Sequence, residues 1–301
     1  MVVSTTRRSA SAIFAQHSKS ATVKVAKSAT SMLGASQNGR KTFSTMSPES
    51  DHYTVAITGA SGLLGTAVID ELSRKKEGKL NGKPLRVIKL YRSENVKEAE
   101  RTVDKMITMH PWNPEAESSK DSDAIDKELL ESIDAVVHLA GENVGSGLLP
   151  GPLGMLGIQA WSEEKKDLIM KSRVGPTKAL ANAISKSARP TSFIVASGVG
   201  VYGNDFMADG EDRMSPDESS DVSRTTGFLA DVSREWELAS QPAAHEENRV
   251  VNLRLAPIMS KLGGALGKLY PIFFLGGGGN VGKFDGIIAH DLLRTTPNHV
   301  S

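Results

Sequence analysis

The residues best suited to bind a ligand are the glycines in the stretch 59–65. Gly59, Gly62 and Gly65 have the spacing G-x-x-G-x-x-G. The first glycine permits a tight turn, the second lets backbone N–H groups approach a pyrophosphate, and the third lets a helix pack closely on a strand. An anion there would face the unpaired N–H groups and the positive dipole end of a helix. The spacing therefore predicts a turn that binds the pyrophosphate of a dinucleotide.

The elements around the glycines match this interpretation. An apolar stretch at 55–58 precedes the turn, and apolar side chains at helical spacing follow it, namely Ala67, Val68 and Leu72. This order of strand, turn and helix is the context that the motif requires. An ordinary strand–turn–helix unit with packing glycines is the alternative.

A second apolar segment, at 84–91, is expected to form the neighbouring strand and to select the cofactor. Proteins that bind NAD place Asp or Glu at the end of this strand, where the carboxylate binds the ribose 2′-hydroxyl. Tyr91 and Arg92 stand there instead. Because a guanidinium suits a 2′-phosphate, we expect NADP(H) rather than NAD. A solvated surface charge is the alternative role of Arg92.

Strand and helix segments alternate along residues 49–260, which predicts one doubly wound α/β domain around a parallel sheet. Further strands are expected at 135–140, 192–197 and 249–255, and helices at 162–187 and 228–240. The polar stretch 77–83 is interpreted as a linker, and 95–132 as an inserted helix and loop without chemistry. Gly141 follows one of the strand ends, where a small residue lets the backbone reach the cofactor.

Composition excludes several classes of function. The chain has 301 residues, an apolar fraction of 39% and no Cys, so disulfides and thiolate zinc sites are excluded. Seven of the 36 basic residues and no acidic residue lie in 1–48, so 29 basic residues face 35 acidic residues in the remainder. This acidic body argues against a nucleic-acid binder. No apolar run suits a membrane span, and no cluster has the spacing of a metal site.

The basic stretch 1–48 is rich in Ser, Thr and Ala and has the composition of an organelle transit peptide. It lacks the continuous apolar segment of a secretory signal. We expect cleavage near 40–44 and a mitochondrial location, with the plastid as the alternative. A disordered basic tail on a cytosolic protein is the other interpretation.

Motifs spread over 54–275 resemble those of the extended short-chain dehydrogenase/reductase superfamily. Within it, the chain is most similar to the "epimerase family" group of NADP-dependent sugar-nucleotide epimerases. The motifs are TGASGLLG at 58–65, HLAGENV at 138–144, SGVGVYG at 197–203, FLADVSREWELA at 228–239 and RVVNLRLAPIMSKLGGAL at 249–266. The resemblance implies a Rossmann-type fold that binds NADP(H).

The resemblance also implies which residues contact the cofactor. Phosphate contacts would come from Ser61, Leu63 and Leu64, and the adenosine 2′-phosphate would lie at Tyr91 and Arg92. The remaining contacts would be Leu139 and Ala140 at the adenine and ribose, Arg173 near the cofactor, and Ile258 near the nicotinamide.

The catalytic positions are harder to assign. Enzymes of the superfamily use Ser or Thr with a Tyr-x-x-x-Lys pair, whose tyrosine acts as the general base. Counted along the resemblance, these positions fall on Gly198, Phe228 and Val232, which carry no ionisable group. Ser197 and Tyr202 lie close by and are the remaining candidates for catalysis, with Tyr202 otherwise a packed aromatic.

Other polar residues near strand ends have two open roles. Glu142 and Asn143 would contact substrate or close their loop through hydrogen bonds. Arg254 would hold an anionic substrate or form a structural ion pair. His138, flanked by apolar residues, is expected to be a hydrogen-bonded core histidine.

Two functions from different classes follow. The first is an NADP-dependent oxidoreductase or epimerase that acts on a nucleotide sugar or a similar hydroxyl compound. The second is a non-catalytic NADP(H)-binding sensor or assembly factor. The expected partners are the dinucleotide, an unidentified small-molecule substrate and a further copy of the chain. Because the family continues beyond the matched motifs, residues 261–301 are interpreted as the remnant of a substrate-binding region in a truncated chain.

Overall fold

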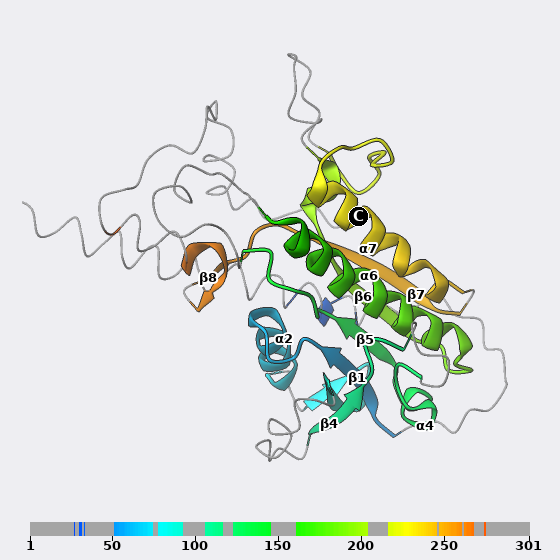
Figure 1. Ribbon diagram of the computed structural model, residues 1–301. Helices are drawn as coiled ribbons and strands as arrows, with labels where there is room; N and C mark the ends of the chain where they lie inside the picture. The colour runs from blue at the N-terminus through cyan, green and yellow to red at the C-terminus, as the bar shows by residue number, and fades with distance from the viewer. Residues whose placement is uncertain are drawn as a thin grey trace, which may run out of the picture.

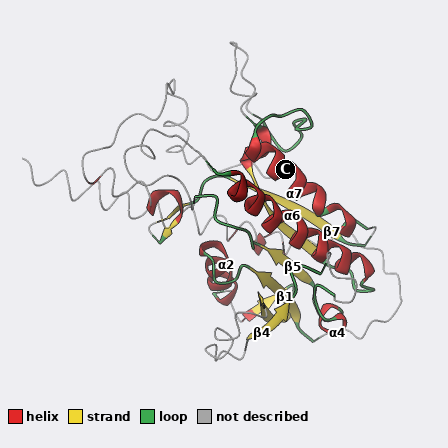
Figure 2. Cartoon of the chain, viewed as in Figure 1, coloured by secondary structure: helices red, strands yellow, loops and turns green. Residues whose placement is uncertain are grey.

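A curled, mostly parallel sheet with helices on both faces forms the framework of the protein (Figures 1 and 2). The computed structural model describes residues 27, 30, 31, 33, 51–74, 78–92, 106–116, 123–145, 161–203, 216–245, 247–260, 262–267 and 274. The strands are β1 (Tyr53–Thr58), β2 (Lys79–Leu80), β3 (Lys83–Arg92), β4 (Ile107–Trp112), β5 (Ala135–His138), β6 (Ser192–Gly198), β7 (Arg249–Leu255) and β8 (Met259–Ser260). The helices are α2 (Leu63–Ser73), α4 (Lys127–Leu130), α6 (Glu163–Lys186), α7 (Phe228–Ala239) and the 3₁₀ turns η3 (Val199–Tyr202) and η5 (Gln241–Ala243).

The strand order is that of a doubly wound dinucleotide-binding fold. Parallel pairs join the strands in the order β4-β3-β1-β5-β6-β7. The chain therefore runs outward in one direction from β1 and then returns to build the other half from β5. Ligands bind such sheets at the carboxyl ends of the strands, beside the reversal of strand order. The expected α/β fold is confirmed, and β1 and β5 mark the reversal.

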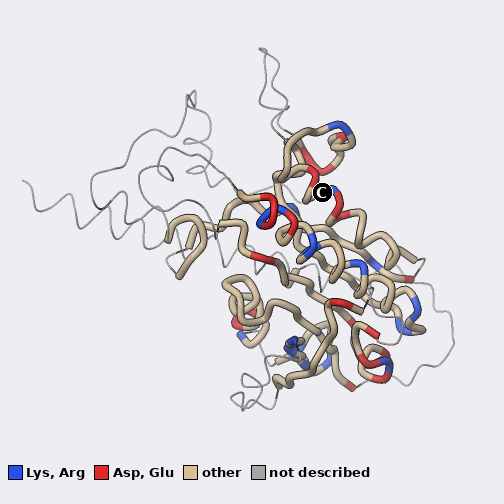
Figure 3. Tube along the Cα trace, in the orientation of Figure 1, with Lys and Arg blue, Asp and Glu red and all other residues tan. Residues whose placement is uncertain are grey.

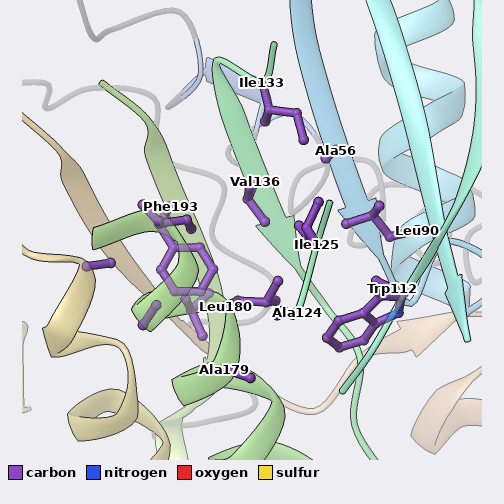
Figure 4. Packing of buried hydrophobic residues seen from close by; sticks show 14 of the residues in the cluster. Ala56, Leu90, Trp112, Ala124, Ile125, Ile133, Val136, Ala179, Leu180 and Phe193 are labelled. Atoms are coloured by element: carbon purple, nitrogen blue, oxygen red, sulfur yellow. The ribbon is translucent and has the colours of Figure 1, made fainter. Parts of the chain in front are cut away.

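Each face of the sheet has its own apolar layer. Alternate residues of β1 point to opposite faces, so Ala56 joins one layer while Val55 and Ile57 join the other. The first layer packs under α6 and contains Leu180 and Phe193, as Figure 4 shows. The second layer packs under α2 through its buried side chains Val68, Ile69 and Leu72. These two layers hold the carboxyl ends of the strands in register.

The segment 95–132 is not the inserted helix and loop that the sequence predicts. Its described part contains β4, which pairs in parallel with β3, and the short helix α4. The strand is easy to miss because it includes Pro111 and is only partly buried. Proline lacks the N–H that a central strand needs and is tolerated at a sheet edge. β4 pairs only with β3 among the described strands, which is consistent with such an edge.

The expected linker at 77–83 also contains secondary structure. β2 and the start of β3 form a two-residue hairpin in which Lys79 pairs with Pro84 and Leu80 with Lys83. Asn81 and Gly82 make the turn with positive φ angles of 52° and 79°. Asn-Gly is the strongest short signal for such a turn, so the sequence offered the means to predict it.

Part of the basic stretch 1–48 contacts the sheet. Leu33 is completely buried in the layer under α2, and Thr30 is also buried. The Leu33 carbonyl oxygen accepts hydrogen bonds from Tyr53 Oη at 3.3 Å and from Asn81 Nδ2 at 3.5 Å. The other residues of this stretch, including the expected cleavage region at 40–44, lie outside the described residues. The same holds for most of 261–301.

Candidate functional site

The glycine turn between β1 and α2 is shaped by close backbone contacts. Gly59 has a φ of +65°, and a Cβ there would lie 2.8 Å from the backbone N of Ala140. A Cβ on Gly65 would lie 2.2 Å from the Gly59 carbonyl oxygen, well inside contact distance. A Cβ on Gly62 would meet the same oxygen at 3.2 Å, which is tight but less severe. The turn therefore needs glycine at its first and third positions for its own geometry.

The first turn of α2 is open to an anion. Gly62 caps the helix without a side-chain hydrogen bond, and its first turn contains no acidic residue. Ser61 and Gly62 are exposed, and Leu63 and Leu64 are half-buried. Helix geometry leaves the first N–H groups without intrahelical partners, and the helix dipole favours negative charge there. The residues present thus fit a dinucleotide pyrophosphate.

The end of β3 places a cation beside this turn. β3 is the parallel neighbour of β1, and its last residue, Arg92, is exposed while Tyr91 is half-buried. Within the described ranges, Arg92 forms no ion pair. An exposed guanidinium that forms no ion pair within the described part of the chain suits a phosphate better than a ribose hydroxyl.

The end of β5 is fixed by Thr58 and His138. Thr58 Oγ1 lies 2.7 Å from His138 Nδ1 and accepts the N–H groups of Leu139 at 3.2 Å and Ala140 at 3.4 Å. His138 is completely buried, and burial lowers its pKa to about 3. Its ring is therefore neutral and packs edge-on against Trp112. These bonds position the Leu139–Ala140 backbone, which the sequence assigns to the cofactor.

Arg173 holds the loop that follows β5. Its Nη2 donates to the Glu142 carbonyl oxygen at 2.8 Å, and its Nη1 donates to the Ile169 carbonyl oxygen at 3.0 Å. The guanidinium lies 5.0 Å from the ring centre of Trp236 and beneath Gly141, where a Cβ would come within 3.3 Å of it. Burial lowers the Arg173 pKa to about 10, against a smaller raising effect of Glu142. Arg173 remains charged and anchors the loop from within.

The positions assigned to the catalytic tyrosine and lysine are apolar and packed. Phe228, at the start of α7, has its ring centre 5.4 Å from that of Trp161. Val232, one turn further along α7, is buried. A Cβ on Gly198, at the end of β6, would lie 3.4 Å from Ser233 Oγ. The structure brings the three positions to the same end of β6 and α7 without placing an ionisable group at any of them.

Ser197 and Tyr202 belong to one network of polar contacts. Ser197 Oγ donates to Glu237 Oε1 at 2.7 Å, and the Arg254 guanidinium binds both Glu237 oxygens at 2.9 and 3.0 Å. Arg254 Nη1 donates to Tyr202 Oη at 3.2 Å, and Tyr202 Oη donates to the Asp217 carbonyl oxygen at 2.9 Å. Hydrogen bonding to Glu237 is the main cause that raises the Arg254 pKa. For Arg254, the structure therefore shows the ion pair, one of its two expected roles.

Ile258 lies in a turn that returns to the glycine motif. Its carbonyl oxygen accepts the Ala265 N–H at 2.9 Å, and Met259 and Ser260 bridge to Gly264 and Gly263. A Cβ on Gly263 would lie 3.8 Å from Leu63 Cδ2, so this turn touches the start of α2. The structure thus brings the Ile258 turn, the glycine turn and the β5 end to one edge of the sheet.

Three residues of the site were given no role by the sequence, although two of them lie within the motifs 58–65 and 228–239. Thr58, Lys165 and Glu237 each act through a partner that is distant in sequence, and only the fold shows that partner. The one available signal is a polar residue at a strand end, since Thr58 directly follows the apolar residues Val55, Ala56 and Ile57 of β1.

With this geometry established, comparison with known proteins gives the family. The family model described as "NAD dependent epimerase/dehydratase family" matches residues 55–271. The chain belongs to this family. The resemblance drawn from the motifs is therefore confirmed, and members of the family bind a nicotinamide dinucleotide.

Relatives within the family support the assignment over most of the chain. An epimerase family protein of Mycobacterium bovis is 32% identical over 229 residues, which make up 76% of this chain and 62% of the relative. An epimerase family protein of Arabidopsis thaliana, named as chloroplastic, is 28% identical over 255 residues, or 82% of this chain and 62% of the relative. The chain thus spans less than two thirds of the length of these relatives.

One solved structure of a relative has the same fold. It is the crystal structure of a nucleoside-diphosphate sugar epimerase from Corynebacterium glutamicum, with 29% sequence identity and a TM-score of 0.52. The match covers 87% of this chain and 42% of that one. Among the described residues, no helix has the length and apolarity to cross a membrane, and no group of three or more His, Cys, Asp or Glu residues could hold a metal ion.

Proposed function

We propose that this protein is an NADP(H)-dependent oxidoreductase or epimerase that acts on a hydroxyl or carbonyl group of a nucleotide sugar or similar compound. The observation that carries the proposal is the pairing of an open glycine turn with an exposed arginine at the neighbouring strand end. The turn suits the pyrophosphate, and Arg92 suits the 2′-phosphate that distinguishes NADP from NAD. When bound, the dinucleotide would supply or accept a hydride.

The chain's own residues would hold the cofactor along one edge of the sheet. Backbone N–H groups of Ser61, Leu63 and Leu64 would bind the phosphates, and Tyr91 would lie beside Arg92 at the adenosine end. Leu139, Ala140 and Gly141 would line the middle, backed by Arg173, and Ile258 would lie at the nicotinamide end. The hydrogen bonds of Thr58 and Arg173 hold this edge in place without the ligand.

A second function, a non-catalytic NADP(H)-binding sensor or assembly factor, is supported by a different observation. Gly198, Phe228 and Val232 stand at the positions that we assign to the catalytic triad. Phe228 packs on Trp161 with the Lys166 ammonium over its ring, and Val232 is buried. Proton transfer needs an ionisable group within hydrogen-bonding reach of the substrate. A protein that only binds the dinucleotide has no such need.

Turnover distinguishes the two functions. The protein would be incubated with NADP⁺ and a panel of nucleoside-diphosphate sugars, and formation of reduced nicotinamide and of epimerised sugar would be followed. The enzyme predicts turnover of at least one sugar, whereas the binding protein predicts tight binding of the dinucleotide without turnover of any. In the same assay, Tyr202→Phe should lower the rate about a hundredfold if Tyr202 is the proton donor.

We also propose that residues 1–48 direct the protein to an organelle, the mitochondrion first and the plastid as the alternative. The composition of this stretch supports the proposal, and the Arabidopsis relative is named as chloroplastic. Fusion of residues 1–48 to a fluorescent protein tests it. Co-localisation with a mitochondrial marker is expected, and diffuse cytosolic fluorescence would contradict both alternatives.

A further inference from the structure

The carboxyl edge of the sheet offers few described groups that could exchange a proton with a substrate. Phe228 and Val232 cannot, and burial holds His138 neutral in the core with a pKa of about 3. Tyr202 donates its proton to a main-chain carbonyl and accepts from Arg254. A charged pair from two other elements lies nearby, formed by Glu142 after β5 and Lys165 in the first turn of α6. Figure 3 shows that basic and acidic residues both occur at the start of that helix.

The Lys165–Glu142 pair differs from the ordinary surface pair beside it. Lys165 Nζ lies 2.6 Å from Glu142 Oε1, and the exposed fractions of the two side chains are 16% and 33%. Lys166 instead pairs with Glu163 on its own helix, at exposed fractions of 36% and 84%. Exposed pairs of the second kind contribute little and reorient freely. Lys165 is the more confined ammonium, and its partner belongs to the edge of the sheet where the cofactor is expected.

Glu142 is held at both of its backbone groups. Its N–H donates to Ser172 Oγ at 3.0 Å, and its carbonyl oxygen accepts from Arg173 Nη2 at 2.8 Å. Ser172 Oγ in turn donates to the Ile169 carbonyl oxygen at 3.1 Å. Because the half-buried Ser172 and the buried Arg173 of α6 fix the backbone of Glu142, they also limit where the Lys165 ammonium can lie.

The aromatic side chains of Trp161 and Phe228 lie close to the loop of Glu142. Trp161 Nε1 donates to the carbonyl oxygen of Val144, two residues after Glu142, at 3.0 Å. The Trp161 ring also packs on Phe228, which occupies the assigned tyrosine position. The loop of Glu142, the start of α6 and the start of α7 therefore meet around Phe228, and Lys166 Nζ lies 5.9 Å from the centre of its ring.

We propose that Lys165 is the proton donor of this protein and that Glu142 is its positioning residue. In carbonyl reduction, the carbonyl carbon gains a hydride from the reduced nicotinamide, and the C=O bond becomes a C–O single bond. The carbonyl oxygen takes a proton from Lys165 Nζ, and the neutral amine then regains a proton from bulk solvent. The product is the alcohol. This inference rests on the proposed oxidoreductase function and assigns to α6 the step that a tyrosine on α7 performs elsewhere in the superfamily.

The test uses the full chain, NADPH and 4-nitrobenzaldehyde, an activated aromatic aldehyde whose reduction consumes one hydride and one proton. Lys165→Met should lower kcat about a hundredfold, because general-acid catalysis contributes at least that factor. Glu142→Gln should lower it less, with partial recovery in Glu142→Asp. NADPH affinity, measured by fluorescence, should stay within threefold of the wild type in all three variants. Lys171→Met is the matched control, since it removes a lysine of the same helix from an exposed pair with Asp167.

Chemical rescue separates a proton donor from a structural lysine. Lys165→Ala should regain activity when butylamine is added, and the gain should saturate with amine concentration. A lysine with only a structural role would show no such recovery. Quenching of tryptophan fluorescence by the nitroaromatic probe, lost in Trp161→Phe, would place the probe beside the pair.

The outcomes separate this inference from the function on which it rests. If the wild type binds no NADPH, the proposed function itself fails. If it binds NADPH and reduces the aldehyde, but Lys165→Met matches Lys171→Met, only the assignment of Lys165 is overturned. The same conclusion follows if Tyr202→Phe or Lys166→Met abolishes turnover and Lys165→Met does not. NADPH binding without reduction of the aldehyde and without turnover of any nucleoside-diphosphate sugar overturns the assignment and favours the non-catalytic function.

Discussion

Two regions at the same edge of one sheet are built in different ways. The β1–α2 region presents backbone groups: a glycine turn with a φ of +65° and a helix start without a side-chain cap. The β6–α7 region presents side chains, and most of their polar atoms are already paired with one another. The first region leaves backbone N–H groups available to a ligand, whereas the polar side chains of the second region hydrogen-bond to one another.

The difference shows which parts of a functional site can be predicted from local sequence. A turn that binds a ligand through its backbone N–H groups needs glycine at fixed positions. Those glycines can be recognised in the sequence as a motif. A catalytic centre depends on side chains from several elements that only the fold brings together. The position that the resemblance assigns to the catalytic tyrosine holds Phe228, which packs on Trp161.

The largest expected effect is loss of the binding turn in Gly65→Ala. The new Cβ would lie 2.2 Å from the Gly59 carbonyl oxygen, so the backbone of the turn must move. Such overpacking costs about 3 kcal/mol, which corresponds to roughly a hundredfold weaker binding of NADPH. Isothermal titration with NADPH measures the change.

Gly175→Ala provides the matched control for this prediction. Gly175 lies inside α6, and a Cβ there would meet nothing within 4 Å. Replacing a helical glycine with alanine should stabilise the protein by about 0.5–1 kcal/mol and leave NADPH affinity unchanged. Equal NADPH affinities of Gly65→Ala and Gly175→Ala would show that the glycine turn does not form the site.

A smaller effect is expected from the network in the β6–α7 region. Arg254→Met leaves the half-buried Glu237 carboxylate without its bidentate partner. Breaking a buried pair on one side costs about 3 kcal/mol, and somewhat less here because both side chains keep some exposure. Urea unfolding should show this loss, while NADPH affinity should change less than threefold. A large loss of affinity with unchanged stability would mean that Arg254 contacts the ligand.

The pH dependence of stability provides a third comparison, at the β5 end. His138 is neutral in the folded protein because burial lowers its pKa to about 3 from an ordinary 6.5. Between pH 6.5 and pH 3, His138 is protonated in the unfolded chain but stays neutral in the folded protein. The free energy of unfolding therefore decreases as the pH falls from 6.5 toward 3. At pH 5 this loss is about 2 kcal/mol.

His138→Gln keeps a hydrogen-bond acceptor for Thr58 and removes the titration. Its stability should therefore fall less between pH 7 and pH 5 than that of the wild type, by about 2 kcal/mol in urea unfolding. Parallel pH profiles for the two proteins would contradict a neutral, buried His138.

Much of the fold could be predicted from the sequence, because its central strands are apolar and its helices amphipathic. β7 has the bounds that the sequence predicts, and α6 and α7 differ from prediction by one residue at one or both ends. β4 could not be predicted in this way, since an edge strand containing Pro111 has a mixed pattern that resembles a loop.

The candidate site was predictable only in its backbone part. The close approaches of Gly59 and Gly65 agree with the geometric roles that their spacing predicts. The partners of Glu142, Ser197 and Arg254 lie 17 to 52 residues away in sequence, and no local pattern identifies them. Their contacts depend on the register of β5, β6 and β7, which only the folded sheet supplies.

The central claim is that the β1–α2 turn and Arg92 form an NADP(H) site, and titration tests it most directly. The protein would be titrated with NADPH and with NADH, in the wild type and in Arg92→Gln. The wild type should bind NADPH at least about tenfold more tightly than NADH, a difference of roughly 1.4 kcal/mol, and Arg92→Gln should remove most of that preference. Equal affinities of the wild type for both dinucleotides would contradict the role of Arg92, and binding of neither would contradict the site itself.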